Sequence, residues 1–125
     1  MALFWTDSIV LCYSNVDAAK QWWIDAFDCK QAKLPGWDNP LPSDVALKLP
    51  GDDEPRILLS DRAEVQEAGL EPPTHPIIFC NKLQKGYEYL LGRGVVSGPI
   101  QDGGDTQFFE IHDAEGNVVE ICKEP

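Results

Sequence analysis

SIVLCYSNVDAAKQWWIDAF, residues 8–27, joins a short apolar run to an amphipathic segment. Residues 8–13 are rich in branched and aromatic side chains, which is typical of a strand. Asn15 is a good helix N-cap. The apolar residues after it recur at helical spacing, which predicts one buried helix face; they are Val16, Ala19, Trp22, Trp23, Ala26 and Phe27. The stretch predicts a strand–helix unit with at least one of the two tryptophans in the core.

A second strand–helix unit occurs about half a chain later. Residues 75–80, HPIIFC, form another apolar run, and Asn81 follows as a cap. Residues 82–94, KLQKGYEYLLGRG, carry leucines and tyrosines at helical spacing and end at Gly94, a natural C-cap. The recurrence predicts that the chain is built from two similar halves.

Each helix is followed by segments that we expect to be strands. In the first half these are residues 29–33, 44–50 and 55–60; in the second they are residues 95–98, 106–113 and 117–124. The link 112–117, HDAEGN, has Gly and Asn where a tight turn needs positive φ. The connector between the halves contains two adjacent prolines and is expected to hold one helical turn.

The fold class that follows is α+β. We expect one domain over residues 1–125, with β-α-β-β-β modules at about 6–62 and 74–124. Neither module buries much apolar surface alone. Together they form a curved mixed sheet around a cavity, with the helices outside.

Composition excludes several classes of partner. The chain has 125 residues, 43% of them apolar, and 10 Lys+Arg against 21 Asp+Glu give a net charge of -11. That balance argues against nucleic acids and anionic membrane surfaces, which require a basic footprint. No segment reaches the ~18 apolar residues of a membrane span, and the first residues do not resemble a signal peptide. Four single cysteines fit buried thiols in a reducing compartment, so we expect a cytoplasmic protein.

Three stretches resemble the vicinal oxygen chelate superfamily, which includes glyoxalase I, bleomycin-resistance proteins and extradiol dioxygenases. They are residues 14–28, SNVDAAKQWWIDAFD; residues 75–83, HPIIFCNKL; and residues 109–121, FEIHDAEGNVVEI. The third is the most specific, although Ala114 stands where the family pattern has proline. The resemblance implies a small molecule bound in the cup of the sheet, often beside a divalent metal.

The resemblance also implies metal ligands, and here the chain departs from the pattern. His75 and Glu120 match the second-half histidine and glutamate ligands. The first-half histidine position falls on Ser8, and the final strand of the first half offers no carboxylate. Two protein ligands make a weak site, so we expect a divalent metal completed mostly by water.

The final hairpin suggests a further acidic group. If Asp113 pairs with Asn117, Glu110 lies opposite Glu120, and the repulsion of two carboxylates raises the pKa of one. Glu110 is then the candidate catalytic acid–base or an added ligand; the alternative is a solvated outer face. We expect substrate contacts at Ser8, Phe79, His112 and Trp37, the last of which could instead pack on a partner chain.

Two functions remain open at this point. The first is a metal-dependent lyase or dioxygenase of the superfamily. The second is a metal-free binding protein that sequesters a small, cationic ligand such as an antibiotic. The family closes open sheets by pairing modules between chains, so a homodimer is expected.

Overall fold

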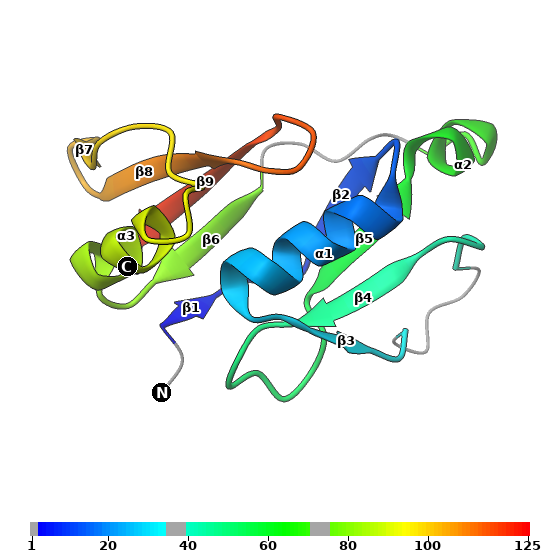
Figure 1. The fold of residues 1–125 in the computed structure, drawn as a ribbon, viewed down its shortest axis with the longest axis horizontal. Coiled ribbons are helices and arrows are strands. Elements are labelled where there is room, and N and C mark those ends of the chain that lie inside the picture. Colours follow the sequence, from blue (N-terminus) through cyan, green and yellow to red (C-terminus); the bar gives the residue numbers. More distant parts are fainter. Residues whose placement is uncertain (1–2, 35–39, 71–75) are drawn as a thin grey trace.

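A computed structural model describes residues 3–34, 40–70 and 76–125. It contains two mixed sheets and three helices (Figure 1). The first half holds β2 (Ile9–Tyr13), α1 (Val16–Phe27), β3 (Lys30–Ala32), β4 (Val45–Lys48) and β5 (Ile57–Asp61). The second holds β6 (Ile77–Cys80), α3 (Leu83–Leu91), β7 (Gln101–Asp102), β8 (Gln107–His112) and β9 (Val118–Lys123). The α+β fold class is confirmed, although the sheets do not close.

The two halves repeat one topology. The four-stranded sheet has the order β2-β5-β4-β3, and its β2 and β5 are parallel. In the second half the order β6-β9-β8-β7 repeats it, and here β6 and β9 are the parallel pair. Figure 1 shows the sheets side by side, with α1 over the four-stranded sheet and α3 over the other. One continuous apolar core joins residues of both halves.

Helix α1 forms where the sequence predicts it. The Asn15 side chain accepts a hydrogen bond from Ala18 N at 3.1 Å, which caps the helix. The helix ends at Asp28, which adopts a left-handed conformation with φ 56°. Trp23 is completely buried, which confirms a tryptophan in the core. The predicted helical turn in the connector is α2 (Arg62–Glu67), capped by Asp61.

The second unit differs from its prediction at both ends of the helix. The N-cap is Lys82 rather than Asn81, and Asn81 N donates to Leu3 O, which continues the strand pairing. The helix ends at Gly92, and Gly94, with φ 76°, lies in the following turn. In the link between the last two strands, positive φ is needed at Gly116 alone and not at Asn117.

The predicted strand at 95–98 is also wrong. Only Val96 makes a bridge, to Ile111, and the strand that follows α3 is β7. Gly98 and Pro99 come two and three residues after Val96, and proline has no N–H to contribute to a ladder.

A short strand that sequence analysis did not anticipate crosses between the halves. β1 (Phe4–Trp5) pairs antiparallel with β6, so Phe4 lies opposite Cys80 and Trp5 opposite Phe79. Phe4 packs edge-on against Phe27 of α1, with ring centroids 5.1 Å apart. The start of the chain therefore belongs to the sheet of the second half.

Polar contacts also fasten the two halves together. The Asp28 carboxylate accepts hydrogen bonds from the Tyr89 hydroxyl at 2.6 Å and from Arg93 Nη2 at 3.1 Å. Glu115, in the turn between β8 and β9, accepts from Ser14 N at 3.0 Å and from Asn15 N at 2.9 Å. Within the described ranges, no helix is long and apolar enough to cross a bilayer.

Candidate functional site

The five-stranded sheet has one face under α3 and the core, and an opposite face that we call the open face. Strand alternation places Ile78, Phe109, Ile111, Val119 and Ile121 on the core side, all completely buried. Residues paired across the strands make up the open face: Trp5, Ile77, Phe79, Phe108, Glu110, His112, Val118, Glu120 and Cys122. The open face therefore combines aromatic rings with two carboxylates.

Glu110 and Glu120 lie directly opposite each other on β8 and β9. Asp113 N donates to Asn117 O at 3.0 Å, which is the pairing from which this register follows. Glu120 N donates to Pro76 O, and Glu110 O accepts from Ser97 N, so the main-chain groups of the two glutamates point away from each other. Such a pair brings the Cβ atoms to about 4.5–5.5 Å, and both side chains are half-buried.

Cys122 sits beside Glu120 on the same face. Its Sγ donates a hydrogen bond to Glu120 Oε1 at 3.0 Å. Burial, together with this carboxylate, raises the pKa of the Cys122 thiol to about 12. The free thiol is therefore protonated at neutral pH.

A cavity of about 450 Å³ opens next to these residues, lined in part by Ile77, Phe79, Cys122 and Glu124. The rings of Trp5 and Phe79 stack with centroids 4.5 Å apart and planes 28° apart. Trp5 Nε1 donates to Glu124 Oε2 at 2.7 Å, which fixes the indole in place. The cavity thus has the Phe79 ring in its wall, with the Trp5 indole stacked on that ring, and the Glu124 carboxylate at its edge.

The predicted site residues are placed as follows. Phe79, Glu110 and Glu120 share the open face, and His112 is exposed at its border, opposite Val118. Ser8 is exposed and directly precedes β2 of the other sheet. His75 and Trp37 lie outside the described residues.

Sequence analysis missed three contributors to this site: Trp5, Cys122 and Glu124. Trp5 depends on a two-residue strand that no periodicity signals. Cys122 could have been found, because it shares the strand alternation of Glu120.

The donors of the described part of the chain do not make a metal centre by themselves. No group of three or more His, Cys, Asp or Glu side chains in that part could hold a metal ion. On the open face only Glu110 and Glu120 offer charged oxygens, and metal sites of the zinc type use three or four protein ligands. A metal there depends on His75.

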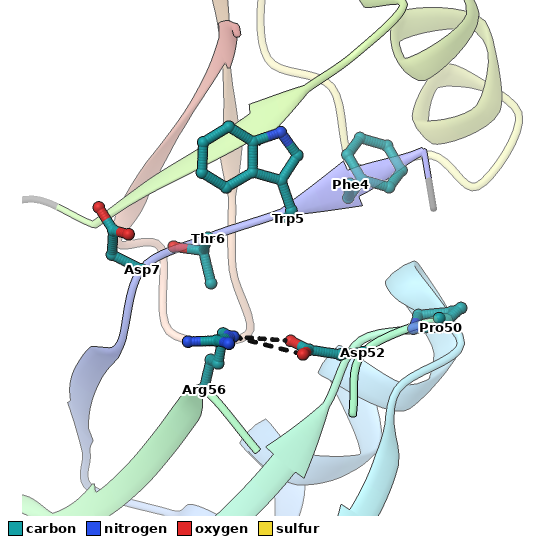
Figure 2. A pocket seen from close by; sticks show the side chains of 8 residues that line it. Phe4, Trp5, Thr6, Asp7, Pro50, Asp52 and Arg56 are labelled. Carbon is teal, nitrogen blue, oxygen red and sulfur yellow. Dashed lines mark hydrogen bonds and ion pairs between the residues drawn. The ribbon is translucent and has the colours of Figure 1, made fainter. Parts of the chain in front are cut away.

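A second cavity, of about 350 Å³, lies between β1 and the loop that precedes β5 (Figure 2). Arg56 and Asp52 point toward each other in it, with Arg56 Nε 3.2 Å from Asp52 Oδ2. The Thr6 hydroxyl donates to Ile77 O at 2.9 Å. Arg56, Asp52 and the Thr6 hydroxyl therefore already have hydrogen-bond or ion-pair partners.

Comparison with known proteins supplies the fold. No protein-family model and no curated protein sequence matches the chain. Among solved structures, a member of the glyoxalase/bleomycin resistance protein/dioxygenase superfamily from Sphaerobacter thermophilus DSM 20745 is similar, with a TM-score of 0.72 and 18% identity over 96% of this chain and 97% of that chain.

Two further structures agree. TioX from Micromonospora sp. ML1 matches with a TM-score of 0.67 and 17% identity over 97% of each chain. Lactoylglutathione lyase from Agrobacterium tumefaciens matches with a TM-score of 0.65 and 18% identity over 95% of this chain and 92% of that chain. The chain therefore has the vicinal oxygen chelate fold of the glyoxalase/bleomycin resistance/dioxygenase superfamily, as the sequence resemblance implies.

Proposed function

We propose that the chain binds a small, flat, cationic molecule on the open face of its five-stranded sheet. The observation that carries the proposal is the stacked pair of Trp5 and Phe79 beside a cavity of about 450 Å³. Ligand cavities are commonly lined by aromatic side chains with a few placed polar groups, and their volumes fall in this range.

The charge of the ligand is inferred from the carboxylates around the aromatic pair. Glu124 borders the cavity together with Asp105 and Lys123, and it accepts a hydrogen bond from the Trp5 indole. Glu110 and Glu120 face each other on the same side of the sheet, so the carboxylates around the aromatic pair outnumber the lysine. A cation placed among these groups gains from the carboxylates and from the electron-rich ring faces. A neutral aromatic ligand would gain only the stacking.

A metal-dependent lyase or dioxygenase is the second candidate, and its support is the superfamily fold. It requires His75 and Glu120 to hold a divalent metal together, with Glu110 as the acid–base group. When bound, such a metal would polarise the oxygens of a substrate. Within the described residues Glu120 already accepts a hydrogen bond from Cys122, and the other charged donor is Glu110.

A second copy of the chain would close the open face. The open face carries Ile77, whose surface is 36% exposed. The five-stranded sheet to which it belongs does not close into a barrel with the four-stranded sheet. Exposed apolar side chains on an uncovered sheet favour association. The ligand would then lie between the open face and the partner.

Titration with ethidium, a flat aromatic cation, tests the proposal. We expect saturable binding that weakens at least about tenfold in Glu120→Gln and in Phe79→Ala, because each removes one of the attractive groups. Glu88→Gln, an exposed glutamate on α3, is the matched control and should bind as the wild type does.

A neutral aromatic of similar size, acridine at pH 8, serves as the charge control. Equal affinity for the two probes would contradict a cationic ligand. Unchanged ethidium binding in both open-face variants would contradict the site itself.

A further inference from the structure

Two lysines face each other across neighbouring strands of the four-stranded sheet. Lys30 on β3 lies opposite Lys48 on β4 in the register of that pair. Directly paired residues project to the same side of a sheet, with Cβ atoms about 4.5–5.5 Å apart, and like charges at such positions are destabilising. In a chain with 10 Lys+Arg and 21 Asp+Glu, an opposed lysine pair is an unexpected use of two cations.

Both lysines line one cavity, of about 480 Å³. The cavity is bounded also by the loop at Pro50 and Gly51, and by the carboxylates of Asp28 and Asp52. It lies apart from the open face, since no residue of the open face lines it. Lys30 is exposed and Lys48 is half-buried.

The two carboxylates of the cavity already have partners. Asp28 accepts from the Tyr89 hydroxyl at 2.6 Å and pairs with Arg93 at 3.1 Å. Asp52 pairs with Arg56 at 3.2 Å, and Arg56 also reaches Glu54 at 2.9 Å. By contrast, across the described ranges neither Lys30 nor Lys48 has an ion pair. The carboxylates of the cavity are therefore engaged with other cations, whereas its two lysines are not in ion pairs within the described residues.

Protection of a sheet edge does not account for the pair. A lysine on an edge strand deters pairing with another chain, and Lys30 stands on the edge strand β3. Lys48, however, is the last residue of β4, an inner strand that pairs with β3 on one side and, as far as Leu47, with β5 on the other. An inner strand needs no such protection, so the second lysine requires another explanation.

We propose that the Lys30–Lys48 cavity binds a small dianion, such as the phosphate group of a metabolite. Two ammonium groups supply up to six N–H donors and two positive charges to one group of oxygens. The bound dianion would also relieve the repulsion between the lysines, so binding and stability are linked. This site is independent of the open face and takes a ligand of opposite charge.

Calorimetric titration with inorganic phosphate at pH 7.5, at constant ionic strength, tests the proposal. We expect one site per chain, weakened at least about tenfold in Lys30→Met and in Lys48→Met, because each loses a charge-assisted contact. Phosphate should also raise the melting temperature of the wild type and of Lys85→Met, an exposed α3 lysine used as the control, but not of the two cavity variants. Each cavity variant removes a like-charge repulsion, so it is expected to remain folded.

Succinate identifies the geometry of the anion. Tighter binding of phosphate indicates a single dianionic group, and tighter binding of succinate indicates two separate carboxylates; either supports the site. The proposal is overturned if neither anion binds at millimolar concentration, if chloride competes as well as phosphate, or if Lys85→Met loses as much binding as Lys48→Met.

Discussion

The Tyr13 hydroxyl donates a 2.6 Å hydrogen bond to Asp113 Oδ2 across 100 residues of chain. Trp23 Nε1 in turn donates to the Tyr13 oxygen at 2.9 Å. Asp113 also accepts from Asn117 N at 2.8 Å, which shapes the turn between β8 and β9. Burial and the Asp113 bond raise the pKa of Tyr13, so the phenol stays protonated. One buried carboxylate therefore shapes the turn of the second half and fastens it to the first.

Removal of this hydroxyl should destabilise the protein. In Tyr13→Phe, the Trp23 indole loses its acceptor and Asp113 loses a donor, both in the core. Leaving buried polar groups unpaired costs about 1–3 kcal/mol, measurable as a lower urea midpoint with an unchanged slope. Tyr87→Phe is the control, because no hydrogen bond of the Tyr87 hydroxyl occurs among the described residues. Equal midpoints for the two variants would contradict the role of Tyr13.

Gly86 allows α3 to approach the sheet closely. A Cβ at this position would collide with Cys80 Sγ and lie 3.1 Å from Phe4 Cε1. Although alanine is the better helix former, we expect Gly86→Ala to lower stability by about 1–3 kcal/mol through overpacking.

A double-mutant cycle isolates the contact. Cys80→Ala removes the sulfur, so the Gly86→Ala penalty should shrink in that background. Gly92→Ala, where the added Cβ meets only backbone oxygens at 3.5 Å and beyond, should be neutral or stabilising. The same penalty in both Cys80 backgrounds would show that the clash lies elsewhere.

Acidification should weaken the contact between Asp28 and α3. Hydrogen bonds from Tyr89 and then Arg93 lower the pKa of Asp28 below its usual value of 3.8. Because the folded-state pKa is lowered, the stabilisation is fully present above pH 4 and is lost as the pH falls through the folded value. The difference in urea midpoint between wild type and Asp28→Asn should therefore be largest at pH 7 and shrink as the pH falls below 3.8. A difference that does not depend on pH would contradict this assignment.

Metal binding should depend on His75 and be weak. A metal held by His75 and Glu120 needs a neutral imidazole, so its affinity should fall as the pH drops through about 6.5, the pKa of an unperturbed histidine. Titration with Zn²⁺ at neutral pH should give weak binding that His75→Ala abolishes and Glu120→Gln reduces. Glu88→Gln is again the control. Tight binding that survives His75→Ala would place the metal elsewhere in the chain.

Sedimentation should reveal a homodimer of about twice the 13.9 kDa of one chain at micromolar concentration. Ile77→Asp should shift it toward the monomer, because a charge on the open face opposes burial. Leu91→Asp, at a position on α3 that is 53% exposed, should leave the dimer intact. A wild-type monomer would contradict the assembly, and equal dissociation of both variants would move the interface to another surface.

Local patterns in the sequence predict much of the fold. Asn15, the spacing of apolar residues in α1 and the link that contains Gly116 each act within a few neighbours, so the helix and the final hairpin follow from the sequence. Once the hairpin register is known, Glu110 must lie opposite Glu120.

Contacts between distant segments lie beyond such patterns. β1 has two residues, and only its partner Phe79 explains why Trp5 belongs to the site. The opposition of Lys30 and Lys48 depends on the register of strands joined by a long loop. The hydrogen bond from Asn81 N to Leu3 O likewise joins residues almost eighty positions apart.

The crossing of β1 into the second half has a consequence for the order of folding. During synthesis, the four strands of the first half emerge together and can pair, whereas Phe4 and Trp5 find their partners only after Phe79 and Cys80 leave the ribosome. Phe4 and Trp5 are thus synthesised well before the residues with which they pair. Contacts of such sequence separation slow folding, and until they form the two aromatic side chains lack their native partners and expose apolar surface.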